Sequence, residues 1–127
     1  MALTSFADVQ TFLNKFCSDH SINITGAQHG VFWNNSTGGR TPYDNFINGD
    51  VPNVQDPNGN PLPILNKING KYDGPSSNLV MALNGDSPLF TKSDPNAPIG
   101  QMPYNGPYMS ADQIGEISAW ITAQCPE

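Results

Sequence analysis

The chain has 127 residues, enough for a single domain with a core, and its formal net charge is −6 with only 5 Lys and Arg residues. This balance excludes nucleic acid and anionic membrane surfaces as expected partners, because both require clustered basic side chains. Hydrophobic residues make up only 37% of the chain, and 12 glycines and 12 prolines predict a thin core covered by long ordered loops.

The first predicted element is a helix over residues 5–17. Ser5 can cap its N-terminus, and Asp8 lies in the first turn, where backbone N–H groups are free. The apolar residues recur at helical spacing, namely Phe6, Val9, Phe12, Leu13 and Phe16. The N-terminal string "MALTSFADVQTFL" lacks the basic start and apolar centre of a signal peptide, and no apolar run in the chain is long enough to span a membrane.

The middle of the chain is rich in turn-forming residues, as in "STGGRTP", "INGD" and "DPNGNP". We expect short helical segments around residues 41–47 and 62–67. Because no segment alternates strictly between apolar and polar residues, strands should be few and short. Another short helix, residues 78–83, should begin after Ser77 and end at Gly85.

The last predicted element is a helix from Ser110 to about Ala123. Ser110 and Gln113 have the spacing of a capping box, and Pro126 prevents much further extension. Its apolar face consists of Ile114, Ile117, Trp120 and Ile121. The plan is one domain, residues 1–127, with a helix at each end, small helices in long loops and little or no β-structure.

The string "KFCSDHS" at the end of the first helix holds the residues with the most distinctive chemistry. Cys17 and His20 have the Cys-x-x-His spacing of a copper site, but the required second histidine upstream has no room. Cys17 could instead form a disulfide with Cys125, a closure of over 100 residues worth about 4–5 kcal/mol in the chain-entropy model. His20 could also have no ligand role, because a lone histidine at a helix end commonly hydrogen-bonds to a carbonyl group or to water.

The stretch "SSNLVMALNGDSPLF…APIGQMPYNGPYMSADQIGEISAWITAQCPE" resembles the C-terminal half of bacterial class I cytochrome c domains. The order of a Ser-x-Leu helix, a glycine, a Met-Pro loop and a capped helix ending in Trp-Ile agrees over roughly residues 76–127. The opening "FADVQTFLNKFCSDHS" is similar to the first helix of that family, which runs into a Cys-x-x-Cys-His motif.

The resemblance implies a mainly α, cytochrome c-like fold in which the terminal helices cross at Trp120. It also implies heme as cofactor, with His20 and Met102 as axial iron ligands and Phe16, Cys17 and Trp33 in the heme site. Histidine and methionine together suit electron transfer. Since Phe16 and Asp19 stand where the family has its attachment cysteines, heme would be held largely without covalent bonds.

Two functions therefore remain open. One is a periplasmic or secreted electron carrier that meets a redox partner protein. The other is a heme-free binding or structural module of the same fold, stabilised by the Cys17–Cys125 disulfide. The aromatic residues Phe32, Trp33, Tyr43 and Phe46 could wall a heme pocket or fill an empty one. No catalytic motif is recognisable, so we do not expect an enzyme.

Overall fold

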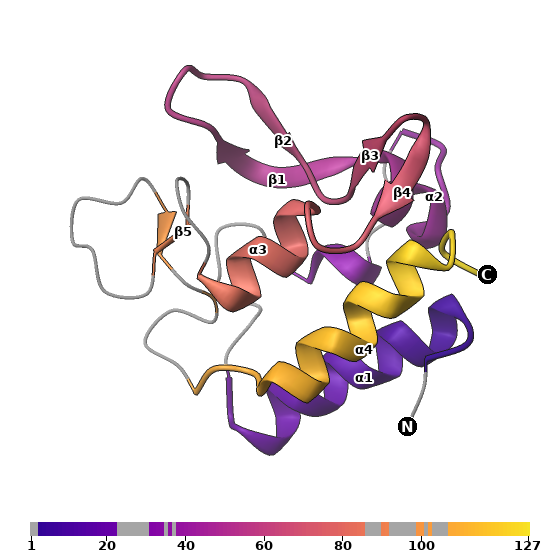
Figure 1. The fold of residues 1–127 in the computed structure, drawn as a ribbon, viewed down its shortest axis with the longest axis vertical. Coiled ribbons are helices and arrows are strands. Elements are labelled where there is room, and N and C mark those ends of the chain that lie inside the picture. The colour runs from indigo at the N-terminus through magenta and orange to yellow at the C-terminus, as the bar shows by residue number, and fades with distance from the viewer. Residues whose placement is uncertain are drawn as a thin grey trace.

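The computed structural model describes residues 3–22, 31–34, 36, 38–85, 90–91, 99–100, 102 and 107–127. Helices and short strands alternate along these residues (Figure 1). In chain order they are α1 (Phe6–Asp19), the 3-10 helix η2 (Phe32–Asn34), α2 (Pro42–Asn48), β1 (Asp50–Gln55), β2 (Pro61–Pro63), β3 (Asn66–Ile68), β4 (Lys71–Asp73), α3 (Asn78–Asn84), β5 (Phe90–Thr91), β6 (Ile99–Gly100) and α4 (Ala111–Thr122).

The architecture is mixed α/β, so the prediction of a mainly α fold with little or no β-structure is wrong. Antiparallel pairs form between β1 and β2 and between β3 and β4, while β5 and β6 pair in parallel. The helix expected around residues 62–67 is replaced by the end of β2 and the start of β3. Pro61 and Pro63 explain the difference, because proline removes a backbone donor and pushes the residue before it toward extended conformations.

The helices with sequence signals for their ends agree with the expectation. Helix α1 begins after Ser5, whose hydroxyl accepts from the Asp8 backbone N–H, but it continues two residues beyond the predicted end. Helix α3 ends at Gly85, which has the left-handed φ of 69°. At α4, Ser110 and Gln113 form the predicted capping box. These signals act within one or two turns, which is why the sequence alone reveals them.

The terminal helices meet at the ring of Trp120. Figure 1 shows α4 running beside α1 in the opposite direction, and the Phe6 and Trp120 ring centroids lie 6.2 Å apart. The two chain ends consequently lie at the same end of the molecule (Figure 1). The Trp120 indole N–H donates to the Pro126 carbonyl at 3.0 Å, which holds the last residues against α4.

A cluster of aromatic rings fills the space between these helices and α2. Phe46 is fully buried, and its ring centroid lies 5.3 Å from Phe6, 6.1 Å from Phe32 and 6.0 Å from Trp120. Tyr43 adds an edge-on contact with Phe6 at 5.4 Å. Rings at such distances bury large apolar areas and attract one another through their quadrupoles. The cluster is therefore the centre of the core.

The β3–β4 hairpin turns on two residues, Asn69 and Gly70, with φ angles of 53° and 80°. Positive φ at both central positions is the geometry of a type I′ turn. Its three cross-strand pairs are Asn66–Asp73, Lys67–Tyr72 and Ile68–Lys71. Gln124, just after α4, fastens the hairpin by accepting from the Tyr72 N–H and donating to the Tyr72 carbonyl, each at 3.1 Å.

Candidate functional site

The C-terminal end of α1 holds three of the predicted site residues. Phe16 is buried and Cys17 is half-buried, whereas His20 caps the helix with an exposed side chain. The imidazole lies against Phe16, with ring centroids 4.5 Å apart. An i,i+4 ion pair at 2.6 Å, between Lys15 and Asp19, covers the neighbouring surface. The histidine thus lies on the outside of the helix end.

Met102, the other predicted iron ligand, lies beside α3. Its backbone N–H donates to the Ala82 carbonyl at 2.9 Å, and its side chain is half-buried. The flanking residues 101 and 103–106 lie outside the described part of the chain, so only this single residue of the "QMP" motif is placed.

Trp33, predicted to wall the heme, is part of the protein core. It is buried, its ring lies edge-on to Phe32 at 5.0 Å, and its indole N–H donates to the Asn14 side chain at 2.7 Å. The Gln10 amide donates to the Trp33 carbonyl at 3.0 Å. Both polar contacts come from α1, so they fix η2 directly against the first helix.

These side chains do not fit a heme held between His20 and Met102. An imidazole that ligates heme iron in a closed site faces an apolar cavity, but His20 is exposed and its only ring contact among the described residues is with Phe16. Phe16 and Trp33 belong to the same buried cluster as Phe46 and Trp120. Within the described ranges, no group of three or more His, Cys, Asp or Glu side chains gathers to bind a metal ion either.

The predicted Cys17–Cys125 disulfide is absent, because both cysteines are free. The reason is the antiparallel packing of the terminal helices. The Cys125 carbonyl accepts from the Tyr43 hydroxyl, and Tyr43 contacts Phe6 at the start of α1. Cys17 lies eleven residues farther along that helix, a rise of about 16 Å. A disulfide requires Cα atoms within about 7 Å of each other.

Neither thiol is activated. Burial raises the pKa of Cys125 from 9.0 to about 12, an effect that the Lys67 charge only partly offsets. Burial also raises the pKa of Cys17. Because the thiolate is the reactive and metal-binding form, both side chains act at neutral pH as small apolar residues.

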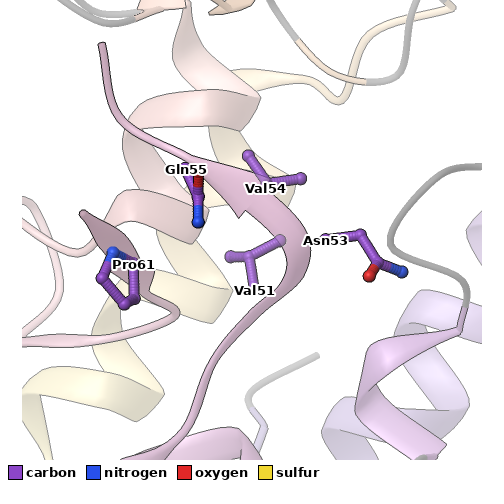
Figure 2. A pocket seen from close by; sticks show the side chains of 5 residues that line it. All are labelled: Val51, Asn53, Val54, Gln55 and Pro61. Carbon is purple, nitrogen blue, oxygen red and sulfur yellow. The ribbon is translucent and has the colours of Figure 1, made fainter. Parts of the chain in front are cut away.

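The β1–β2 hairpin carries an open hollow that the sequence analysis missed. Its walls come from both strands (Figure 2), and the residues are Val51, Asn53, Val54, Gln55 and Pro61. The strands pair at Asp50–Pro63 and at Gln55–Pro61, with an irregular register between. Asn53 has a φ of 61°, so the bulge turns the strand and re-aims its side chains. The turn string "DPNGNP" was the available signal for this hairpin.

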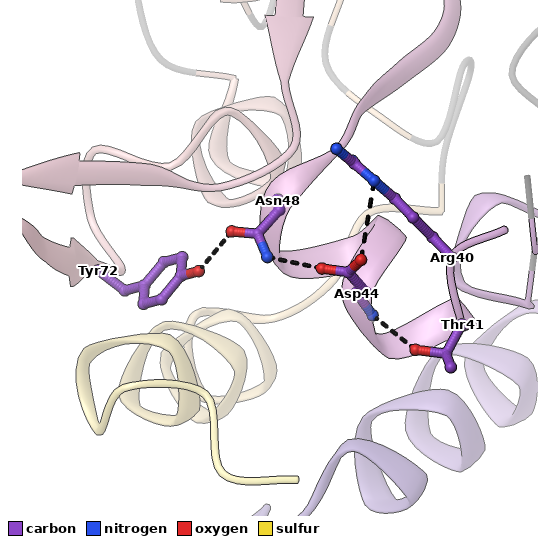
Figure 3. Close-up of polar contacts among 5 residues, drawn as sticks. All are labelled: Arg40, Thr41, Asp44, Asn48 and Tyr72. Carbon is purple, nitrogen blue, oxygen red and sulfur yellow. Dashed lines mark hydrogen bonds and ion pairs between the residues drawn. The ribbon is translucent and has the colours of Figure 1, made fainter. Parts of the chain in front are cut away.

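A second feature missed from the sequence is a polar chain between α2 and β4 (Figure 3). The Tyr72 hydroxyl donates to Asn48 at 2.9 Å, and the Asn48 amide donates to Asp44 at 2.7 Å. Asp44 also lies 3.7 Å from Arg40, and its backbone N–H donates to the Thr41 cap at 3.1 Å. Every charge in this chain is paired, so its role is to fasten the β3–β4 hairpin to α2.

Comparison of the chain with protein-family models, with curated proteins and with solved structures finds no match. The resemblance to cytochrome c domains therefore stays a prediction. Among the described helices, none is both long and apolar enough to cross a membrane.

Proposed function

We propose that the protein is a heme-free, non-catalytic binding module that recognises a partner protein through its β1–β2 hairpin. The observation that supports this most is the aromatic cluster of Phe6, Phe32, Phe46 and Trp120. These rings fill the interior between α1, α2 and α4, and Phe16 and Trp33, both expected in the heme site of the competing proposal, a heme electron carrier, belong to the same buried cluster.

The packing argument favours the heme-free module. Protein interiors are as dense as organic crystals, so a core either contains a cofactor or has side chains in its place. Here Phe46, Ile117 and Ile121 have no accessible surface, and Trp120 is 1% exposed. Phe16 and Trp33, the two aromatic residues expected in the heme site, are buried in this cluster and already in contact with other core side chains.

The hairpin hollow offers chemistry suited to a protein partner. Val51, Val54 and Pro61 contribute apolar side chains, while Asn53 and Gln55 contribute amides that make the lining surface more polar than apolar (Figure 2). None of the five side chains is charged. A partner segment with an apolar anchor could contact Val51, Val54 and Pro61, and its backbone groups could hydrogen-bond to the Gln55 amide. In Figure 1 the hairpin projects from the helices, and three of the lining residues, Asn53, Gln55 and Pro61, are exposed.

A matched pair of substitutions tests this proposal. Val54→Arg introduces a charge into the hollow, whereas Ala119→Arg introduces the same charge on the exposed face of α4. Proteins captured from the native host by the parent chain should be lost with Val54→Arg and kept with Ala119→Arg, and their affinity for the purified chain should fall about tenfold or more with Val54→Arg. Equal capture and equal affinity for both variants would contradict the proposed binding surface.

A further inference from the structure

The chain contains five Asn-Gly pairs, namely Asn48–Gly49, Asn58–Gly59, Asn69–Gly70, Asn84–Gly85 and Asn105–Gly106, the last outside the described residues. In such a pair the glycine amide nitrogen can attack the asparagine side-chain carbonyl, because glycine has no Cβ to hinder the approach. The chemistry is identical at every pair. The surrounding structure decides which pair reacts.

The four described pairs differ first in the attacking nitrogen. The Gly49 N–H donates to the Asn45 carbonyl at 2.8 Å, and the Gly59 N–H donates to the Asp56 carbonyl at 3.0 Å. The Gly85 N–H donates to Met81 at the end of α3. Gly70 alone among these four donates no backbone hydrogen bond within the described part of the chain. Its nitrogen does not have to break a contact before it loses its proton.

The pairs differ also in the group under attack. The Asn48 side chain is held at both ends, since its Nδ2 donates to Asp44 at 2.7 Å and its Oδ1 accepts from Tyr72 at 2.9 Å. Asn69 is exposed, and its side chain makes no hydrogen bond to the residues described. Its Cγ is accordingly open to both the neighbouring nitrogen and water.

We propose that Asn69 is a site of spontaneous deamidation, with water as the only co-reactant. A base removes the Gly70 amide proton, and the nitrogen forms a bond to the Asn69 Cγ while the Cγ–Nδ2 bond breaks. The side-chain nitrogen leaves as ammonia with that proton, giving a five-membered succinimide. Water then cleaves either of the two ring C–N bonds and produces aspartate or isoaspartate, with no oxidant or reductant.

The reaction requires the turn to leave its closed geometry, and the hairpin permits this. Only three cross-strand pairs support the turn, and a two-stranded hairpin of this length is marginally stable by itself. Its anchor, Gln124, contacts the strand at Tyr72 and not the turn. The tip can therefore open while the base of the hairpin stays fastened.

Deamidation at this position changes the charge and the backbone of the hairpin. A new carboxylate would be added at the tip of the hairpin, two residues along the chain from Lys67, whose ammonium lies over the Tyr72 ring, and from Lys71. Isoaspartate adds a methylene group to the main chain of a two-residue turn, which shifts the Ile68–Lys71 pairing. The shift would change the position of Ile68, an exposed apolar side chain, on the surface of the hairpin.

Incubation of the folded protein in mildly alkaline buffer, followed by peptide mapping with isoaspartate detection, tests the proposal. Asn69 should deamidate about tenfold faster than Asn48, Asn58 or Asn84, a factor that corresponds to one net hydrogen bond. In urea the four rates should converge to within a few-fold, because the protecting contacts are lost. Equal rates in the folded state, or a faster rate at any other described pair, would overturn it.

Asn58 provides the matched control, because it is also exposed and lies in a hairpin loop. The Asp56 side chain holds that loop by accepting from the Asn58 and Asn60 backbone N–H groups, each at 2.9 Å. Asp56→Ala should raise the Asn58 rate several-fold and leave the Asn69 rate unchanged, while Asn69→Gln should abolish the reaction at position 69. An unchanged Asn58 rate would show that hydrogen bonding does not select the site. Asn69→Gln lies in the β3–β4 turn, outside the hollow used in the binding experiment, so the two proposals fail independently.

Discussion

Cys125 is a residue whose burial gives a measurable pH dependence. It is 1% exposed, its Sγ lies 3.8 Å from the Ile121 carbonyl, and burial raises its pKa from 9.0 to about 12. Between these two values the folded chain holds the thiol proton and the unfolded chain has released it. Its contribution to stability is therefore complete below pH 9 and is lost progressively as the pH rises toward 12.

We predict that the free energy of unfolding falls by up to about 1.4 kcal/mol per pH unit above pH 9 because of this one group. Cys125→Ala should remove that component of the slope, as measured by urea unfolding between pH 8 and pH 10, up to the ordinary tyrosine pKa of 10.0 at which the unfolded chain would lose tyrosine protons as well. Val9→Ala, a buried truncation without a titrating group, should lose stability but keep the parent slope. An identical slope in Cys125→Ala and the parent would contradict the assigned burial.

At the scale of elements, the contact between the β4 end and α4 depends on a glycine. A Cβ added at Gly74 would lie 2.2 Å from the Ser118 carbonyl oxygen and 2.4 Å from its Oγ. The Gly74 N–H also donates to Thr122 at 3.0 Å. No side chain can be added here unless the backbone of one element moves away from the other.

Gly74→Ala should consequently destabilise the protein by about 1–3 kcal/mol, the usual range for an overpacked core. Gly115→Ala is its natural control, because it lies in the middle of α4 and a Cβ there meets nothing within 4 Å. That variant should gain about 0.5–1 kcal/mol from helix propensity. Thermal unfolding should show a lower melting temperature for Gly74→Ala and a higher one for Gly115→Ala. Melting temperatures that shift in the same direction would refute the close approach of Gly74 to Ser118.

Helices with capping residues at their ends could be predicted from the sequence, whereas the pairing of strands could not. Ser5, Ser110 and Gly85 act on backbone groups within a turn, and the helices they bound agree with the expectation. The β3–β4 hairpin was missed although Asn69–Gly70 is a strong hairpin signal, since its three-residue strands do not alternate. Its position depends on Gln124, fifty-two residues from Tyr72, which no local pattern reveals.

At the scale of the whole molecule, two of the predicted heme-site residues, Phe16 and Trp33, belong to the buried core. The sequence resemblance placed His20, Met102, Phe16, Cys17 and Trp33 around a heme, but that resemblance could not specify whether the aromatic residues wall a cavity or fill it. Phe32 stacks on Phe46 with an interplanar angle of 9°, which requires the space between α2 and η2 to be closed. Both cysteines are free, so the disulfide expected to stabilise the heme-free module is absent, and the periplasmic or secreted location stays a prediction.

The most direct test of the central claim is an absorption spectrum, with a pyridine hemochrome assay and iron analysis, of the protein purified from its native host. A heme-free module predicts no Soret band, substoichiometric iron and no change in thermal unfolding when hemin is added. A Soret band with one iron per chain that disappears in His20→Ala, but not in the control His29→Ala, would contradict the account and establish the electron carrier instead.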